Sequence, residues 1–277
     1  MSILHGFYFA FGLVVGSFLN VCICRIPRGE SVVSPRSHCP GCGAAIRPHD
    51  NVPLLSYLLL HGRCRSCGES ISLQYPVVEL ATGLLFYACA AEWAFTPPTF
   101  VYSLFLALLV ILVFVDYQHQ ILPNVVTIPG TIAGILLSPW QAEGTSRDFL
   151  SVAAASALNP DGYETLLPWV GSVLGALIGG GILLVVGFAY QLVRRRAGLG
   201  MGDVKMMAMV GAFLGWRSAL LTIFAGSFAG SIIGLFLIMF KGKNLQHKLA
   251  FGTFLGTGAA AVLFFGASFL GWYAGPR

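Results

Sequence analysis

Two aspartates of this 277-residue chain stand where acid–base chemistry is expected. Asp116 ends one apolar run, and Asp203 opens another directly after two glycines, Gly200 and Gly202. An ionised side chain at a membrane helix is costly, so by default it marks function. Two carboxylates that share one water can catalyse hydrolysis, because the charged member deprotonates the water while the neutral member polarises the scissile carbonyl. We therefore predict that Asp116 and Asp203 form a catalytic pair.

A structural interpretation of the same residues stays open. Either aspartate could end or cap a helix, and Asp203 suits an N-cap because glycine precedes it and an apolar run follows. Functionally, Gly200 and Gly202 would let the backbone come close to an extended substrate strand. Lys205 is expected to support the site of the two aspartates or, alternatively, to extend its ammonium group to the phosphate layer of a membrane.

Four of the seven cysteines form two Cys-x2-Cys pairs with 21 residues between them: Cys39, Cys42, Cys64 and Cys67. Each pair can form a knuckle that offers two thiolates, and two knuckles complete a tetrahedral S4 shell. A closed shell of this kind suits structural Zn²⁺ and leaves no open position for chemistry. A thiol–disulfide relay is the rival interpretation, although the odd cysteine total argues against a complete disulfide framework. The other three cysteines are expected to be buried small apolar residues: Cys22, Cys24 and Cys89.

The composition is that of a membrane protein. The chain is 56% hydrophobic and only 10% charged, whereas a soluble domain has about 25% charged residues. Several apolar runs approach 20 residues, the length of a membrane-spanning helix. The first, at 5–24, lacks a preceding basic region and a cleavage site, so we expect a retained helix. The net charge of +5 does not indicate nucleic-acid binding, and no such partner is expected.

We predict an all-α polytopic membrane protein with about eight transmembrane helices and a small cytoplasmic zinc-binding insert. The helices are expected at 5–24, 76–95, 99–117, 121–138, 167–193, 203–215, 218–240 and 250–272. The sixth is short for a bilayer, and the sixth and seventh could be divided differently. The chain is expected to have three parts: the first transmembrane helix (1–24), the four-cysteine insert (25–75) and a transmembrane core that carries the two aspartates (76–277). A short surface helix is also expected at 148–158.

Basic residues set the expected orientation, because they favour the cytoplasmic side. With the insert inside, the inner side holds thirteen of them: Arg25, Arg28, Arg36, Arg47, Arg63, Arg65, Arg194, Arg195, Arg196, Lys205, Lys241, Lys243 and Lys248. The outer side holds three, Arg147, Arg217 and Arg277. This places both termini outside and brings both aspartates to the cytoplasmic boundary.

Glycines that recur every four residues predict close helix packing, since such ridges let backbones approach in lipid. They are Gly12 and Gly16, then Gly171, Gly175 and Gly179, and finally Gly226, Gly230 and Gly234.

The order and spacing of these motifs resemble the bacterial type IV prepilin peptidases over nearly the whole chain. The similarity begins with Gly16-Ser17-Phe18-Leu19-Asn20 and continues through both cysteine pairs and Tyr75-Pro76-Val77-Val78-Glu79. It then includes Asp116 with Leu122-Pro123, and Gly200-Met201-Gly202-Asp203.

The resemblance implies a membrane aspartyl peptidase of the Gly-x-Gly-Asp type. Such enzymes of pilus and type II secretion systems remove a positively charged leader from prepilins and pseudopilins, after a glycine and on the cytoplasmic face of the inner membrane. They then methylate the new N-terminal residue with S-adenosylmethionine. The family's catalytic aspartates correspond to Asp116 and Asp203, and its zinc-type insert corresponds to the four cysteines.

Two features depart from the family pattern. Many relatives have further acids near the first aspartate, where this chain has Gln118 and Asn124, so Asp116 is the remaining candidate. A glycine-rich fingerprint for S-adenosylmethionine is not evident. Glu30 and Glu79 lie in matching stretches and are candidates near the methyl-donor site, although a first-turn acid such as Glu79 also suits the helix dipole.

Two other functions are kept. The first is a peptidase with a purely structural zinc insert and without methyl transfer. The second is a transporter or proton channel that uses the two acids as a relay, although transport folds usually place such acids near the middle of the bilayer.

Overall fold

The structure is a computed structural model that describes residues 2–142, 145, 148–195, 200–241 and 250–274. These residues are predominantly helical, and β-pairing among them is limited to two isolated bridges in the cysteine insert. The helices are α1 (Ser2–Arg25), α2 (Leu55–Leu59), α3 (Gln74–Trp93), α4 (Pro97–His119), α5 (Asn124–Leu136), α6 (Phe149–Leu158), α7 (Tyr163–Arg194), α8 (Met201–Lys241) and α9 (Phe251–Ala274), with 3₁₀ turns η1 (Ile26–Arg28), η2 (Pro48–Asn51) and η3 (Ser138–Trp140). The all-α prediction is therefore confirmed.

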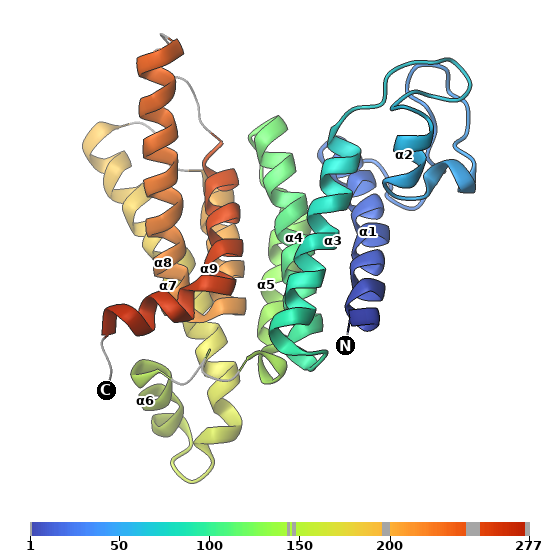
Figure 1. The fold of residues 1–277 in the computed structure, drawn as a ribbon. Helices are drawn as coiled ribbons and strands as arrows, with labels where there is room; N and C mark the ends of the chain where they lie inside the picture. Colours follow the sequence, from blue (N-terminus) through green and yellow to red (C-terminus); the bar gives the residue numbers. More distant parts are fainter. Residues whose placement is uncertain (1, 143–144, 146–147, 196–199, 242–249, 275–277) are drawn as a thin grey trace. The chain divides into compact units, whose positions relative to one another are not determined.

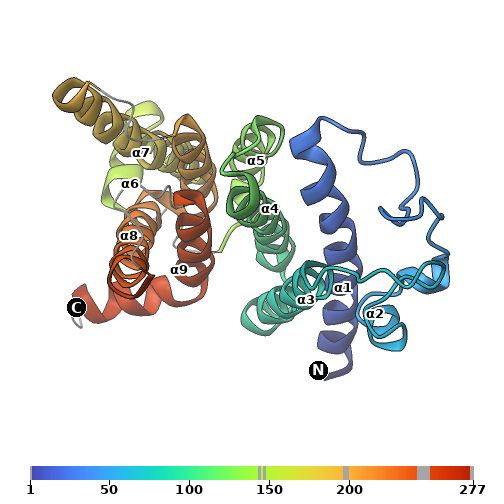
Figure 2. The same cartoon turned by 90° about the horizontal axis from the view of Figure 1, so that it is seen from above.

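The chain divides into two compact units, residues 1–111 and 112–277, and the division falls within α4. In unit 1, α1 and α3 lie side by side (Figures 1 and 2). Their contact follows from small residues: a Cβ placed on Gly12 would lie 2.9 Å from the Cα of Gly83, and one on Gly16 would lie 2.7 Å from the Cα of Glu79. The predicted close packing at Gly12 and Gly16 is thus confirmed.

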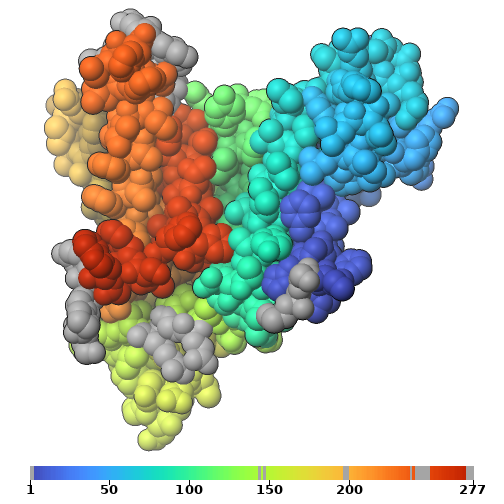
Figure 3. All heavy atoms as spheres, viewed as in Figure 1, coloured from blue at the N-terminus to red at the C-terminus, as the bar shows by residue number. Residues whose placement is uncertain are grey.

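The cysteine insert connects α1 to α3. It forms a lobe at the end of these helices that lies away from the N-terminus (Figures 1 and 3). Its only regular elements among the described residues are short: η1, η2 and the five-residue α2. A segment with so little secondary structure and apolar core needs another source of stability, which a metal cluster can supply.

Unit 2 is built around α7 and α8. The carbonyl oxygens and Cα atoms of α8 approach α7 at glycines, and Gly175 meets Gly211 backbone to backbone. A Cβ on Gly179 would lie 2.5 Å from the carbonyl oxygen of Met207. The side chains of α8 that face this contact are completely buried, including Met206, Met207 and Phe213. The glycine ridge predicted on α7 therefore lies at a helix contact.

The chain reverses its direction inside α8, at Gly215 (φ 75°, ψ 168°). Met207 and Ala219 both lie within 3.2 Å of the position of a Cβ on Gly179, whereas a straight helix would separate them by about 18 Å. The two halves of α8 are therefore antiparallel. The predicted helices at 203–215 and 218–240 correspond to these halves, with the boundary at the predicted place.

The reversal is stabilised by α6, which corresponds to the surface helix predicted at 148–158. Asp148 caps α6 by accepting hydrogen bonds from the N–H groups of Leu150 and Ser151, each at 3.0 Å. Its carboxylate also accepts one from the indole N–H of Trp216 at 2.7 Å. Asp148 thus connects the start of α6 to the residue that follows the reversal.

Five of the described helices are long and apolar enough to cross a membrane: α1, α4, α7, α8 and α9. They also expose large apolar side chains, for example Phe7 at 70% and Phe224 at 67%, as lipid contact requires. The count of eight crossings remains a prediction. Some of the basic residues used for the orientation lie outside the described residues: Arg147, Arg196, Lys243, Lys248 and Arg277.

Candidate active site and metal cluster

The two aspartates meet in unit 2. Asp116 lies in the last turn of α4 and Asp203 in the first turn of α8, and their exposed fractions are only 5% and 9%. The charge of Asp116 acts on Asp203, so the two carboxylates are close although 87 positions separate them in the sequence. The predicted pair is therefore one site in space.

The break between α4 and α5 packs against both helix starts of this site. Leu122 lies in the break, and its Cβ would be 2.8 Å from a Cβ on Gly202, in the first turn of α8. Its Cδ1 would be 3.0 Å from a Cβ on Gly252, in the first turn of α9. That same Cβ would lie 3.0 Å from the Cγ of Asp116. Gly202 and Gly252 thus allow Leu122 to pack closely against the starts of α8 and α9.

Asp203 is the third residue of α8 and not its N-cap, because the helix begins at Met201. Its N–H donates to the carbonyl oxygen of Gly200 at 3.1 Å, and a backbone hydrogen bond at Gly200 also reaches its carboxylate. A side chain at position 200 would crowd this contact, because a Cβ on Gly200 would lie 3.2 Å from Asp203 Oδ2. Gly200 and Gly202 therefore both lie at the aspartate pair.

Lys205 joins α8 to α5. Its Nζ donates to Asn124 Oδ1 at 2.8 Å, in an exposed contact. Asn124 is the first residue of α5. Lys205 is thus two residues from Asp203 on the same helix.

Sequence reasoning missed Gly252 and Thr253. Both N–H and Oγ1 of Thr253 donate to Asp116 Oδ2, at 2.6 Å and 3.0 Å. The available signal was the Phe251-Gly252-Thr253 stretch, which opens the last apolar run as Gly200-Met201-Gly202-Asp203 opens an earlier one. Because threonine is neutral, it did not stand out as the acids did.

In unit 1 the four predicted cysteines gather in one cluster. Their sulfurs all lie within 4.8 Å of one another, and Cys39 Sγ is 3.8 Å from Cys67 Sγ. Zn–S bonds of about 2.3 Å in a tetrahedron give sulfur separations of about 3.8 Å. The donor set and its spacing therefore fit a tetrahedral S4 metal site.

The two knuckles have the same backbone design. In each, the N–H of the first cysteine donates to the carbonyl five residues later, and the N–H of the residue after the second cysteine donates back to the first cysteine, at 2.8–2.9 Å. The returning residues are Gly43 and Gly68, with φ of 70° and 74°. Only glycine adopts this left-handed conformation without strain. The motif is therefore Cys-x2-Cys-Gly, used twice.

Backbone donors favour the thiolate form of one of the four cysteines. Hydrogen bonds from the N–H groups of Cys67 and Ser66, together with a hydrogen bond from Cys39, lower the pKa of Cys64 to about 7. At Cys67 a backbone hydrogen bond at Glu69 lowers the pKa, but burial and the neighbouring thiols raise it to about 12. Metal ligation requires thiolates, so binding would release protons from this cluster.

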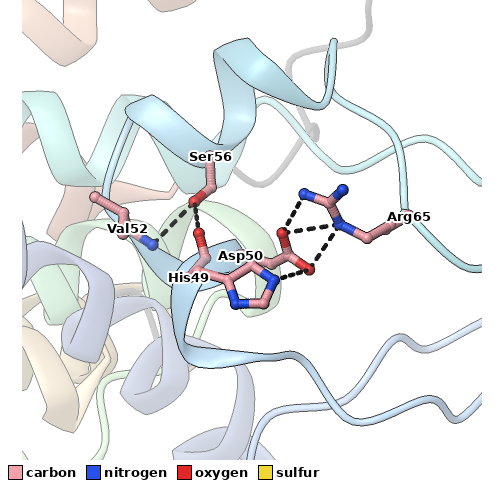
Figure 4. A network of polar contacts seen from close by, with 5 residues as sticks. All are labelled: His49, Asp50, Val52, Ser56 and Arg65. Atoms are coloured by element: carbon pink, nitrogen blue, oxygen red, sulfur yellow. Dashed lines mark hydrogen bonds and ion pairs between the residues drawn. The ribbon is translucent and has the colours of Figure 1, made fainter.

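The second knuckle is tied to the rest of the insert by an ion pair. Arg65, between Cys64 and Cys67, contacts both carboxylate oxygens of Asp50, with distances of 2.6–3.0 Å (Figure 4). Hydrogen bonds from Arg65 lower the pKa of Asp50. Ser56 closes the same segment, since its hydroxyl donates to the carbonyl oxygen of His49 and accepts from the N–H of Val52, both at 3.0 Å (Figure 4).

The two candidate methyl-donor acids differ in their surroundings. Glu79 is buried in α3 and accepts a hydrogen bond from the N–H of Leu54 at 2.9 Å. Leu54 directly precedes α2, so this contact fastens the insert to α3. Glu30 is exposed, and its N–H donates to the carbonyl oxygen of Arg25. The contacts of Glu79 fit a structural tether.

Two family models match the chain. The Bacterial Peptidase A24 N-terminal domain covers residues 10–93, and the Type IV leader peptidase family covers residues 103–235. The four cysteines lie in the first match and the two aspartates in the second, whereas Gly252 and Thr253 lie beyond both. No solved structure matches the chain.

Similar curated proteins carry the name "Prepilin leader peptidase/N-methyltransferase". The protein of Myxococcus xanthus is 40% identical over 86% of this chain, which spans 64% of that relative's length. That of Burkholderia pseudomallei strain 1026b is 34% identical, with 95% of this chain and 86% of the relative covered. That of Aeromonas hydrophila is 32% identical, with 96% and 92% covered.

Proposed function

Because the chain belongs to the type IV leader peptidase family, we propose that it is an aspartic endopeptidase of the bacterial inner membrane. Its substrates are type IV prepilins and pseudopilins, from which it removes the positively charged leader after a glycine. The observation that carries this proposal is the meeting of Asp116 and Asp203 in one buried site. The names of the relatives support the substrate class.

In the proposed reaction the two aspartates share one proton and one water. The ionised carboxylate takes a proton from the water, and the protonated one donates to the oxygen of the scissile carbonyl. Gly200 and Gly202 support the approach of an extended substrate, since neither has a side chain to hold it away. Lys205 is proposed to brace this turn through Asn124.

The proposed second activity is N-methylation of the new terminal residue with S-adenosylmethionine as methyl donor, as the relatives' names suggest. The cysteine cluster is proposed to hold a structural Zn²⁺. Glu79 and Glu30 stay candidates near the methyl donor. The hydrogen bond between Glu79 and Leu54 does not, however, define a pocket for S-adenosylmethionine. We therefore assign no chemical step to the donor.

The proposed topology has eight crossings, both termini outside and the aspartates at the cytoplasmic side. The distribution of basic residues in unit 2 supports it. Arg194 and Arg195 end α7 and Lys205 lies at the start of α8, at the end of the unit that holds the aspartate pair. Arg217 lies beside the reversal at the other end. This asymmetry follows the positive-inside tendency.

The test is a cleavage assay on a prepilin with Asp116→Asn and Asp203→Asn. Asparagine keeps the size of the side chain but cannot exchange the catalytic proton, so each variant should lose at least about 10³-fold in rate. Mass spectrometry of the processed N-terminus reports methylation in the same reaction, and an unmethylated product would favour a peptidase with a structural insert. Normal cleavage by either variant would refute the aspartate pair, provided that both insert into the membrane like the wild type.

A further inference from the structure

The proposed reaction leaves the contact between Thr253 and Asp116 without a role. Two donors of one residue converge on a single carboxylate oxygen, Oδ2: the N–H at 2.6 Å and Oγ1 at 3.0 Å. The hydroxyl also lies 3.3 Å from the carbonyl oxygen of Val113. Since the hydroxyl has one proton, the nearer oxygen, Asp116 Oδ2, is the better acceptor.

This contact is built into the start of α9. Thr253 is the third residue of the helix, and the first four N–H groups of a helix have no acceptor within it. Asp116 comes from α4 and supplies that acceptor, 137 positions away in the sequence. Gly252 permits the approach, because a Cβ there would lie 3.0 Å from both Cγ and Oδ2 of Asp116. The helix dipole of α9 also favours a negative charge at this point.

Asp203 has a weaker set of donors. Its carboxylate receives a backbone hydrogen bond at Gly200, and among the residues that the structure describes we find no side-chain donor to it. The charges of the two aspartates act on each other, so the pair holds one negative charge more readily than two. Asp116 Oδ2, which accepts two hydrogen bonds, is the better place for the negative charge.

We propose that Thr253 is a positioning residue that keeps Asp116 as the ionised member of the pair. Oδ2 of Asp116 is fixed by Thr253, and Oδ1 receives a proton from the water. The water oxygen forms a bond to the scissile carbonyl carbon, while the proton of Asp203 passes to the carbonyl oxygen. When the tetrahedral intermediate collapses, the C–N bond breaks and the amine takes the proton from Asp116, while a hydroxyl proton returns to Asp203. This assignment rests on the proposed peptidase function.

Among the residues of unit 2 that the structure describes, few other charged groups face Asp116. From α8 these are Asp203 and, two residues further, Lys205, whose ammonium group contacts Asn124. Neither α5 nor α9 contains an Asp, Glu, Lys, Arg or His. On α4 itself, His119 and Tyr117 follow Asp116. A change at Thr253 therefore acts on Asp116 with little interference from other titrating groups.

The test compares three variants of the full-length protein in detergent or liposomes. Thr253→Val keeps the shape but removes the hydroxyl donor, and it should lower kcat/KM for prepilin cleavage by about 10- to 100-fold. The acid limb of its pH–rate profile should move to higher pH, because a carboxylate with fewer donors is protonated more easily. Thr253→Ser should recover most of both. Thr257→Val is the matched control, since the Thr257 hydroxyl is exposed and bonds within α9.

Three results would overturn the proposal: wild-type activity and pH profile in Thr253→Val, a lower rate with an unmoved acid limb, or failure of Thr253→Ser to recover. Thermal unfolding of each variant identifies a folding defect. Because Thr253→Ser keeps the hydroxyl, its activity shows whether the loss in Thr253→Val comes from the missing donor or from a change in folding. If Asp116→Asn cleaves normally, the proposed function itself fails. If Asp116→Asn is inactive while Thr253→Val is normal, only the role of Thr253 fails.

Discussion

The cysteine cluster and the aspartate pair are two solutions to the same problem of holding reactive side chains together. The cluster takes all four ligands from residues 39–67 of one insert. Two local turns of identical design present the thiols in pairs. The aspartate site instead draws on α4, α8 and α9, with contacts that join residues 137 positions apart. One site is local, and the other depends on the packing of a whole helical unit.

Because one site is local and the other depends on helix packing, the two sites should respond to different substitutions. A local site that lacks a large apolar core depends on its metal, because metal binding supplies much of the folding free energy. A site made by helix packing depends on contacts far from its chemistry. The glycines of α7 and α8 provide such contacts, since they set how close the helices lie.

The largest effect is expected from the loss of one cluster ligand. Cys39→Ser should lower metal affinity by several orders of magnitude and unfold residues 25–75, because structural zinc binding is worth roughly 10–16 kcal/mol in small domains. Metal content of the purified protein and limited proteolysis of the insert measure the two results. Prepilin cleavage should persist if the peptidase site is independent of the insert.

Cys24→Ser is the matched control, since Cys24 lies in α1 outside the cluster. The Cys24→Ser protein should therefore bind metal as the wild type does. Cys39→Ser protein that retains one equivalent of metal would contradict the S4 site. Loss of cleavage equal to that of Asp116→Asn would show that the two sites are coupled.

The next effect concerns the packing of unit 2. Gly175→Ala places a methyl group against the backbone of Gly211 and should lower the free energy of unfolding by about 3 kcal/mol. Gly181→Ala lies in the same helix with open space around its Cβ and should leave stability unchanged or raise it slightly. Thermal unfolding in detergent compares them, and equal midpoints would contradict the close contact.

The same contrast explains what could be predicted from the sequence. The cluster needed only spacing, because two Cys-x2-Cys pairs fix their own geometry. The positions of the helices, including the break at Gly215, followed from apolar run lengths and glycines. The two aspartates could also be singled out as candidates, since charged residues are rare in such runs.

Thr253 could not be found in this way. Its function depends on an acceptor from another helix, and a neutral residue at a helix start has no distinctive pattern. The tether between Glu79 and Leu54 is similar, because a bond between a buried acid and a loop N–H follows from the fold and not from spacing. The number of membrane crossings also stays open, because α5 has only 13 residues.

A moderate effect is expected at the glycine beside the pair. Gly252→Ala would bring a methyl group to 3.0 Å from Asp116 and Leu122, so the carboxylate must shift and kcat/KM should fall about tenfold. Gly271→Ala, in the same helix with open space, is the control. A wild-type rate for Gly252→Ala would show that the site tolerates displacement of Asp116, which would weaken the contrast with the locally fixed cluster.

The smallest effect is expected from Arg65→Gln, which removes the exposed ion pair with Asp50. Exposed pairs contribute little, so metal affinity should change less than about threefold, while hydrogen exchange at residues 48–56 should become faster. Because Arg65 lowers the pKa of Asp50 below its ordinary 3.8, the pair is intact above that pH and is lost as the pH falls through the lowered value. The difference between wild type and variant should therefore vanish in acid. Arg63→Gln, one residue before the knuckle and without an ion pair among the described residues, should exchange like wild type. A large loss of metal in Arg65→Gln would mean that the cluster depends on contacts beyond its own two turns, and the local description of that site would be wrong.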